Sequence, residues 1–254
     1  MFGSIKTTAF SFVKTNFDKV VMLMIPYFVL ALCSGYLSLM NSNSHSAGYT
    51  YTYNATSTLN YSGFNGILSF FLSIVTCIAI AQIYRAIYKG DYSKLSLAGS
   101  VDGFLPLIPA FLIYSIFLGL LIYMIVLIGA LLVFTMLFYP FLIFVLLAVL
   151  IGIVYLTVRL SLSEMILSDL ILDFSGNYSD KKDLNLLQKV LFSLQESWRL
   201  TRGQFWFLIV LGLSLIGWYF LVIISAGLAI VFVGPYFMAI NATLYKHLID
   251  SYKE

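Results

Sequence analysis

The sequence contains little charge. Aspartate, glutamate, lysine and arginine make up 10% of the 254 residues, whereas 61% are hydrophobic and 17% are aromatic. A soluble domain carries about 25% charged residues because its surface faces water, so this chain has more apolar surface than one soluble core can bury. The net charge of +3 comes without a basic stripe outside the apolar runs, which excludes a typical nucleic-acid binder. We expect an integral membrane protein.

Cysteine and histidine are also scarce, and their positions argue against catalysis. Cys33 and Cys77 lie in apolar runs, which excludes a disulfide scaffold and predicts a buried free thiol at Cys33. His45 and His247 fall on opposite sides of the membrane in the topology derived below, so they cannot share a site. The motifs of zinc proteases, serine hydrolases and phosphate-binding loops do not occur. We therefore predict that the protein is not an enzyme, with no catalytic residue, metal site or cofactor.

Three carboxylates near the end of one apolar run remain as candidates for chemistry: Glu164, Asp169 and Asp173. Asp169 and Asp173 are four residues apart, so they share one face of a helix. The sequence offers them no matched partners. We interpret them as a solvated helix end.

The positions of the charges predict the topology. No charged residue occurs over 20–84, 103–158 or 203–245, stretches of 65, 56 and 43 residues. One crossing needs about 20 residues, so each stretch fits two crossings and a turn. Every charged cluster then lies on one side, and basic loops mark the cytoplasm. The sequence predicts an all-α protein with six spans and both termini in the cytoplasm.

The expected single membrane domain covers residues 1–254. An interfacial helix over 1–19 precedes the first span, because its apolar residues recur at helical spacing; the alternative is that it extends the first span into water. A polar outer loop occupies 41–63, and a cytoplasmic connector with an amphipathic helix occupies 173–202. The outer turn of the second hairpin falls anywhere from Gly129 to Pro140. The six spans are predicted at 20–40, 64–88, 104–128, 141–160, 204–225 and 227–248.

The stretch Leu184–Arg202 predicts the clearest amphipathic helix outside the spans. Its apolar stripe follows the spacing i, i+3, i+4, i+7 and i+11 and consists of Leu187, Val190, Leu191, Leu194 and Trp198. Basic side chains beside such a stripe favour contact with anionic lipid, although basic residues next to spans also set orientation without recognising any lipid. The possible anionic-lipid contacts are Lys181, Lys182, Lys189, Arg199 and Arg202.

The outer loop is rich in tyrosine. Alternating Tyr and Thr over 49–53 predict a short extended strand or hairpin. Tyrosine offers rigid amphipathic contact area, so the loop is either a partner surface or a set of side chains resting on the lipid headgroups. The residues of this possible outer partner surface are Tyr49, Tyr51, Tyr53 and Tyr61.

The spans hold no charge at their middles, where transporters usually place ionisable groups or broken helices. Gln82 and Asn241 are isolated amides, which more often hydrogen-bond between helices than bind substrate. A small-solute or lipid transporter is therefore the alternative interpretation. It predicts a continuous polar cavity between the helices.

A C-terminal pattern resembles that of a known family. Its residues are Ser197-Trp198-Arg199-Leu200, Gly203, Trp206, Ile216-Gly217-Trp218, Pro235-Tyr236 and Tyr245. The chain looks like the bacterial multi-pass membrane proteins of the domain-of-unknown-function-975 family, common in Gram-positive bacteria and distantly similar to the membrane domain of some glycerophosphodiester phosphodiesterases. It departs from that family around 131–150 and 173–183.

The resemblance implies a six-helix bacterial plasma-membrane protein without a catalytic centre. It also implies interface or packing roles for Trp198, Gly203, Gly217, Trp218, Pro235 and Tyr236. The residues and the resemblance together predict a protein that binds membrane lipids, or a membrane-protein or peptide partner. Envelope maintenance, and immunity or sensitivity to membrane-active peptides, are the processes we expect.

Overall fold

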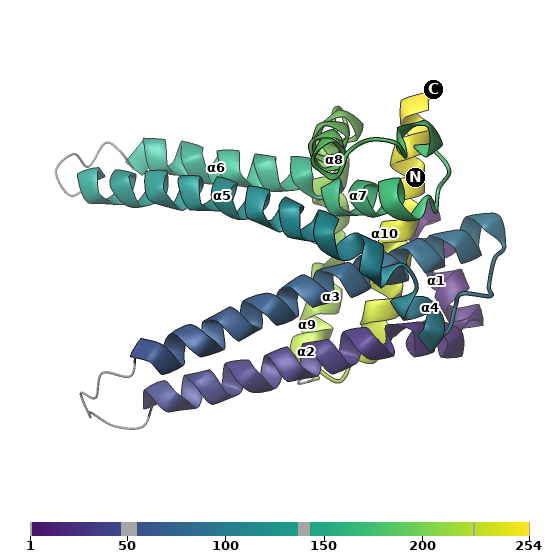
Figure 1. Cartoon of the computed structure of the whole chain (residues 1–254), viewed down its shortest axis with the longest axis horizontal. Coiled ribbons are helices and arrows are strands. Elements are labelled where there is room, and N and C mark those ends of the chain that lie inside the picture. Colours follow the sequence, from purple (N-terminus) through teal and green to yellow (C-terminus); the bar gives the residue numbers. More distant parts are fainter. Residues whose placement is uncertain (1, 47–54, 137–142, 226, 254) are drawn as a thin grey trace. The chain divides into compact units, whose positions relative to one another are not determined.

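The computed structural model describes residues 2–46, 55–136, 143–225 and 227–253 (Figure 1). These residues form ten α-helices and one short 3-10 helix, and no strand occurs among them. The all-α prediction is confirmed. The chain divides into two compact units, residues 1–105 with 222–244 and residues 106–221 with 245–254.

The first unit is built on the hairpin of α2 (Phe17–Ser46) and α3 (Ala55–Lys89), preceded by α1 (Phe2–Thr15). Helices α2 and α3 pack closely, and the short α4 (Leu97–Val101) packs against both. Gln82 of α3 is fully buried, and its amide donates a long hydrogen bond of 3.5 Å to the carbonyl of Gly99 in α4. This bond between two helices is the role that the sequence favoured for Gln82.

The second unit contains α5 (Phe104–Met136), α6 (Ile143–Leu160), α7 (Ser163–Leu172), the 3-10 turn η2 (Ser179–Lys181) and α8 (Leu186–Leu200). It also holds most of α9 (Phe205–Ile224) and the last turns of α10 (Ile230–Lys253). Helix α8 packs against α7 and α6. Side chains of α7 and the following connector are buried, including Ile166, Leu167, Leu170 and Phe174.

Five helical segments of the described chain are long and apolar enough to cross a membrane: Phe17–Leu37, Gly66–Lys89, Leu97–Ala130, Leu147–Leu172 and Phe205–Ile224. Each overlaps one predicted span. The sixth predicted span, 227–248, corresponds to α10, which is helical but not among the five. Its C-terminal part, from 241 onward, carries Asn241, Lys246, His247 and Asp250, and these residues lower its hydropathy.

The segment 41–63, predicted as an outer loop, is helical at both of its ends. Helix α2 continues to Ser46 and α3 begins at Ala55. The sequence argument took polar residues as the sign of a loop, but a continuing helix satisfies its own backbone hydrogen bonds whatever its side chains are. The second hairpin behaves in the same way, because α5 extends to Met136, eight residues beyond its predicted end.

Two burial predictions also need correction. The apolar face of α1, which was expected to rest on lipid, is covered within the chain: Ile5, Ala9, Phe12 and Val13 are buried. Cys33, expected to be a buried thiol, is exposed on α2, whereas Cys77 is buried. A lipid-facing helix exposes apolar side chains, so in this class of protein an apolar run does not imply burial within the protein.

Candidate lipid interface on the second unit

The connector that follows α7 is held by one buried carboxylate, that of Asp169. Its Oδ1 accepts a hydrogen bond from the Ser175 backbone N–H (2.8 Å), and its Oδ2 accepts from the Tyr245 hydroxyl (2.8 Å) and from the Ser175 hydroxyl. Asp169 is only 1% exposed. The prediction of a solvated helix end is therefore wrong for Asp169, because its partner Tyr245 lies 76 residues away in the chain.

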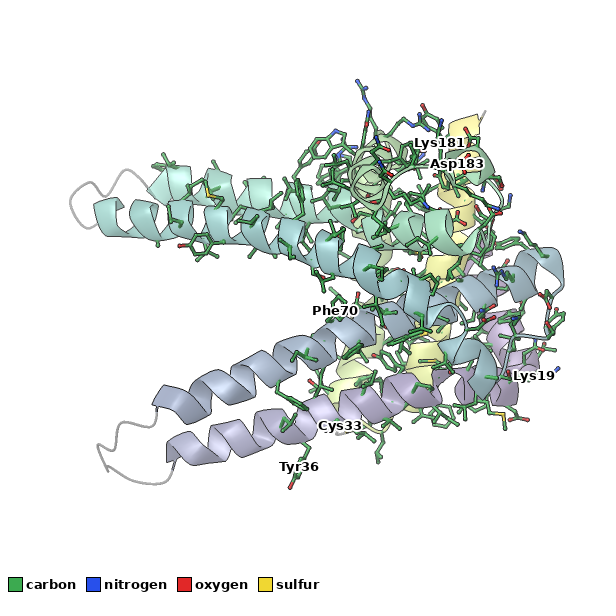
Figure 2. All side chains as sticks on the ribbon, viewed as in Figure 1. Lys19, Cys33, Tyr36, Phe70, Lys181 and Asp183 are labelled. Carbon is green, nitrogen blue, oxygen red and sulfur yellow. The ribbon has the colours of Figure 1, made fainter. Side chains whose placement is uncertain are left out.

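The connector leaves α7 through a left-handed residue, Asp173 (φ 47°), whose N–H donates to the Asp169 carbonyl. Aspartate tolerates this conformation better than most side chains. The Asp173 carboxylate forms an ion pair of 2.6 Å with Lys182 and accepts a 3.2 Å hydrogen bond from the Ser179 hydroxyl. The ion pair between Asp173 and Lys182 therefore joins the two ends of this backbone segment. Lys181 and Asp183, on either side of Lys182, are labelled in Figure 2.

A second buried carboxylate, that of Glu196, joins the connector to α8. It accepts hydrogen bonds from the Tyr178 hydroxyl (3.3 Å) and from the Arg199 guanidinium (2.6 Å). Arg199 in turn lies over the ring of Tyr252, with 4.5 Å between the guanidinium carbon and the ring centroid. Burial raises the pKa of the Tyr178 phenol, and the negative charge of Glu196 raises it further. Tyr178 therefore stays neutral and keeps donating at physiological pH.

Arg159, at the end of α6, is the most enclosed cation of the second unit. It is 7% exposed, and its guanidinium donates to the Tyr155 hydroxyl (2.7 Å) and the Trp198 carbonyl (3.3 Å). The rings of Tyr155 and Trp198 both lie within 5.3 Å of the guanidinium carbon, a geometry that stabilises a cation. The Ser197 hydroxyl donates to the Arg159 carbonyl (2.7 Å). These contacts attach α8 to the end of α6.

Helix α8 presents two different faces. The face that packs into the unit includes Val190, Ser193, Glu196, Ser197 and Leu200, all buried. Most of the predicted apolar stripe lies elsewhere: Leu187 is 60% exposed, Leu191 46% and Trp198 42%. The protein thus covers a mostly polar face of α8 and leaves a row of large apolar side chains uncovered. We name Leu187, Leu191, Leu194 and Trp198 the apolar row.

The five predicted lipid-contact cations are not equivalent. Lys181 pairs with Asp180 (3.2 Å), Lys182 with Asp173 and Arg199 with Glu196. Lys189 and Arg202 form no ion pair with any described residue. Lys189 follows Leu187 by two residues, which places it about 200° around the helix, away from the apolar row. Exposed Arg202 follows Trp198 by four residues and lies just beyond the end of α8, so it is the cation best placed beside the row.

The residues of the predicted packing motif have separate roles. Gly203, in the link between α8 and α9, has φ +85°, a backbone conformation that residues other than glycine rarely adopt. A Cβ atom added to Gly203 or to Gly217 would meet no described atom within 4 Å. The close contact expected at Gly217 is thus not made within the described chain. Trp198 contacts Arg159 and Tyr155, as described above, and Trp218 is exposed. Pro235 lies inside α10, and Tyr236 is buried with its ring 6.3 Å from that of Phe10.

Tyr49, Tyr51 and Tyr53 lie outside the described residues, and Tyr61 lies in α3. Within the described ranges, no group of three or more His, Cys, Asp or Glu side chains could hold a metal ion.

Sequence reasoning missed Arg159, Asp169 and Glu196 as organising residues. Each is charged yet buried, and each depends on a partner in another segment. The sequence of 169–199 does place several carboxylates near aromatic and hydroxyl side chains. That local composition does not show which carboxylate is buried or which residue is its hydrogen-bond partner. Comparison with protein-family models, curated proteins and solved structures finds no match for this chain.

Proposed function

We propose that this chain is a non-enzymatic plasma-membrane protein with six spans and cytoplasmic termini, and that α8 holds its inner face on anionic lipid. The observation that carries the proposal is the uncovered apolar row of α8, with Arg202 beside it. Exposed Leu and Trp side chains next to a basic residue are typical of helices that lie in the membrane interface.

The contacts around α8 support this interpretation. The opposite face of the helix is attached to α6 and to the connector through contacts of Arg159, Ser197 and Glu196. These contacts hold α8 in one orientation, with the apolar row on its uncovered side. Three of the five nearby cations already have carboxylate partners. Anionic lipid recognition then rests mainly on Arg202 and secondarily on the connector lysines.

The cellular role that fits such a protein is maintenance of the bacterial envelope, as the resemblance to the domain-of-unknown-function-975 family suggests. A membrane-active peptide or another membrane protein is the partner we propose for the outer side. The alternative of a solute transporter predicted a continuous polar cavity. The described cavity within the second unit is instead lined mainly by Leu, Ile and Val side chains.

The proposal predicts that phosphatidylglycerol stabilises the full-length protein in detergent more than phosphatidylcholine does. The Arg202→Gln variant should lose about 1 kcal/mol of that stabilisation, the typical value for one cation near an anionic membrane surface. The Lys189→Gln variant removes the same charge on the other side of α8 and is the matched control. Thermal unfolding measured across a titration of each lipid provides the readout.

Equal losses for Arg202→Gln and Lys189→Gln would contradict the assignment of one lipid-facing side. A phosphatidylglycerol effect no larger than that of phosphatidylcholine would contradict anionic recognition altogether. The double variant Leu187→Gln/Leu191→Gln tests the apolar row separately, because both side chains are exposed and their replacement leaves the buried face of α8 intact.

A further inference from the structure

Arg159 is a buried cation that no carboxylate of the described chain neutralises. It is 7% exposed, and none of the ion pairs formed by the described residues includes it. An arginine side chain stays protonated at physiological pH, so the charge is not removed by the loss of a proton. A buried charge carries a large free-energy cost unless an opposite charge and hydrogen bonds offset it. The inner end of α6 therefore holds a positive charge that calls for a counter-ion.

The contacts of the Arg159 guanidinium satisfy only part of its hydrogen-bonding capacity. A guanidinium has five N–H donors, and two of them donate to the Trp198 carbonyl (3.3 Å) and the Tyr155 hydroxyl (2.7 Å). The Nε–H is buried and meets no acceptor among the described residues. The two aromatic rings attract the cation, but they supply neither a full negative charge nor an oxygen acceptor. Three donors remain for an anion.

The segments around Arg159 contain little negative charge. No acidic residue occurs over 103–163, which includes α5 and α6, or over 197–249, which includes α9. The nearest carboxylate along α8 is that of Glu196, and it already accepts a 2.6 Å hydrogen bond in its ion pair with Arg199. The described chain therefore offers Arg159 no counter-charge of its own.

The end of α8 fixes the depth of Arg159. The Ser197 hydroxyl donates to the Arg159 carbonyl (2.7 Å), and the Arg159 guanidinium donates to the Trp198 carbonyl. Arg159 thus lies at the level of the helix that we propose to rest on the inner headgroups, and it is the second-last residue of the predicted span 141–160. The ring of Trp198, which covers the guanidinium, is itself 42% exposed. A lipid headgroup reaches the cation from the side of this ring.

We infer that Arg159 binds the phosphodiester group of an inner-leaflet phospholipid beside the ring of Trp198. A phosphodiester carries one negative charge and oxygens that only accept, which complements a guanidinium that only donates. The planar guanidinium can give a phosphate two parallel N–H···O bonds. The ring of Tyr155 lies 5.8 Å from that of Trp198 and 5.2 Å from that of Phe205, measured between centroids. Such a cluster of aromatic rings is typical of the headgroup level.

The inference deepens the proposed function and rests on it for the level of α8, but the chemistry that it assigns is different. Arg202 is proposed to respond to the net charge of the headgroup. Arg159 is assigned the phosphate, which anionic and zwitterionic phospholipids share. Phosphatidylglycerol and phosphatidylcholine should therefore both bind at Arg159, whereas a glycolipid without phosphate should not.

The experiment titrates the full-length protein in detergent with phosphatidylglycerol, phosphatidylcholine or glucosyl diacylglycerol, all with the same acyl chains. Native mass spectrometry measures the affinity of each lipid. We expect Arg159→Gln to lower the affinity for both phospholipids about tenfold, since it removes charge-assisted hydrogen bonds, and to leave the weak binding of the glycolipid unchanged. Lys189→Gln removes the same charge on the other side of α8 and should change none of the three affinities.

A second measurement needs no variant, because Arg159 also attaches α8 to α6 and its replacement can disturb the fold. Thermal unfolding of the wild-type protein is followed with each of the three lipids and with inorganic phosphate. A ligand that binds only the folded state raises the unfolding temperature, so both phospholipids should stabilise the protein more than the glycolipid does. Inorganic phosphate lacks acyl chains and should have a much smaller effect at the same concentration.

Equal stabilisation of the wild-type protein by phosphatidylcholine and the glycolipid, or unchanged affinities in a folded Arg159→Gln variant, would overturn the site. Equal stabilisation by inorganic phosphate would overturn its assignment to a lipid. If Arg159→Gln weakens both phospholipids and Arg202→Gln has no effect on phosphatidylglycerol, the Arg159 site stands and the anionic preference of the proposed function fails. A phosphatidylglycerol preference that depends on Arg202 alone would support the proposed function and overturn the Arg159 site.

Discussion

Replacing Asp169 by alanine is expected to destabilise the second unit by about 2–4 kcal/mol, because it leaves three donors of a buried network without their acceptor. These donors are the Ser175 N–H, the Ser175 hydroxyl and the Tyr245 hydroxyl. The same change releases the start of the connector that carries Lys181 and Lys182. The free energy of unfolding of the full-length protein in mixed micelles, measured by titration with a denaturing detergent, is the test.

Matched variants separate the network from a general effect of mutation. Tyr245→Phe removes one donor, but the Asp169 Oδ2 that accepted from it keeps the hydrogen bond from the Ser175 hydroxyl, so this change should cost only about 1 kcal/mol. Asp180→Asn changes an exposed carboxylate and should be close to neutral. If Asp169→Ala were as stable as Asp180→Asn, the carboxylate would not organise the connector. A double variant at positions 169 and 245 should lose less than the two single losses added, because the residues are in contact.

The Gly99→Ala substitution is the second change with a large expected effect. A Cβ at this position would overlap the carbonyl oxygen of Lys94 and lie 2.8 Å from its carbonyl carbon. Because the obstacle is backbone, no side-chain rotation relieves it, and α4 must shift from its place against α2 and α3. We expect a loss at or above the upper end of the ~1–3 kcal/mol typical of overpacked sites. The Gln82 hydrogen bond to the Gly99 carbonyl should be lost with it.

The matched control for Gly99→Ala is Gly217→Ala. Gly217 lies inside α9 and a Cβ there meets no described atom, so alanine should be neutral or slightly stabilising, given its higher helix propensity. Thermal unfolding of the two variants in the same detergent makes the comparison. If Gly217→Ala were destabilised and Gly99→Ala were as stable as the wild-type protein, the closely packed glycine would be Gly217, as the family resemblance implied, and not Gly99.

The sequence predicted the class of fold well for a physical reason. Lipid offers no hydrogen-bond partners, so apolar runs of span length must be helical, and the uncharged stretches located five of the structure's apolar helices. Element ends were harder. Ser46 and Ala55 lie in segments where polar side chains suggested a loop, but the helices α2 and α3 continue into them.

The candidate interface was only half predictable. The helical spacing of Leu187, Leu191 and Trp198 identified the apolar row, because that pattern is local. Which face of α8 the protein covers was not readable, since it depends on Arg159 and Ser197 meeting across 38 residues. For the same reason the burial of Asp169 could not be foreseen. A charged residue is identified as buried only when its distant partners are known.

The central claim is a six-span protein with both termini on the cytoplasmic side, and cysteine labelling in intact bacterial cells tests it most directly. In a background with Cys33 and Cys77 replaced by alanine, single cysteines are introduced as Tyr51→Cys, Ser179→Cys and Ser251→Cys. A membrane-impermeant maleimide should label position 51 in intact cells, and positions 179 and 251 only after permeabilisation. Labelling of position 251 in intact cells would place the C-terminus outside and contradict the six-span account.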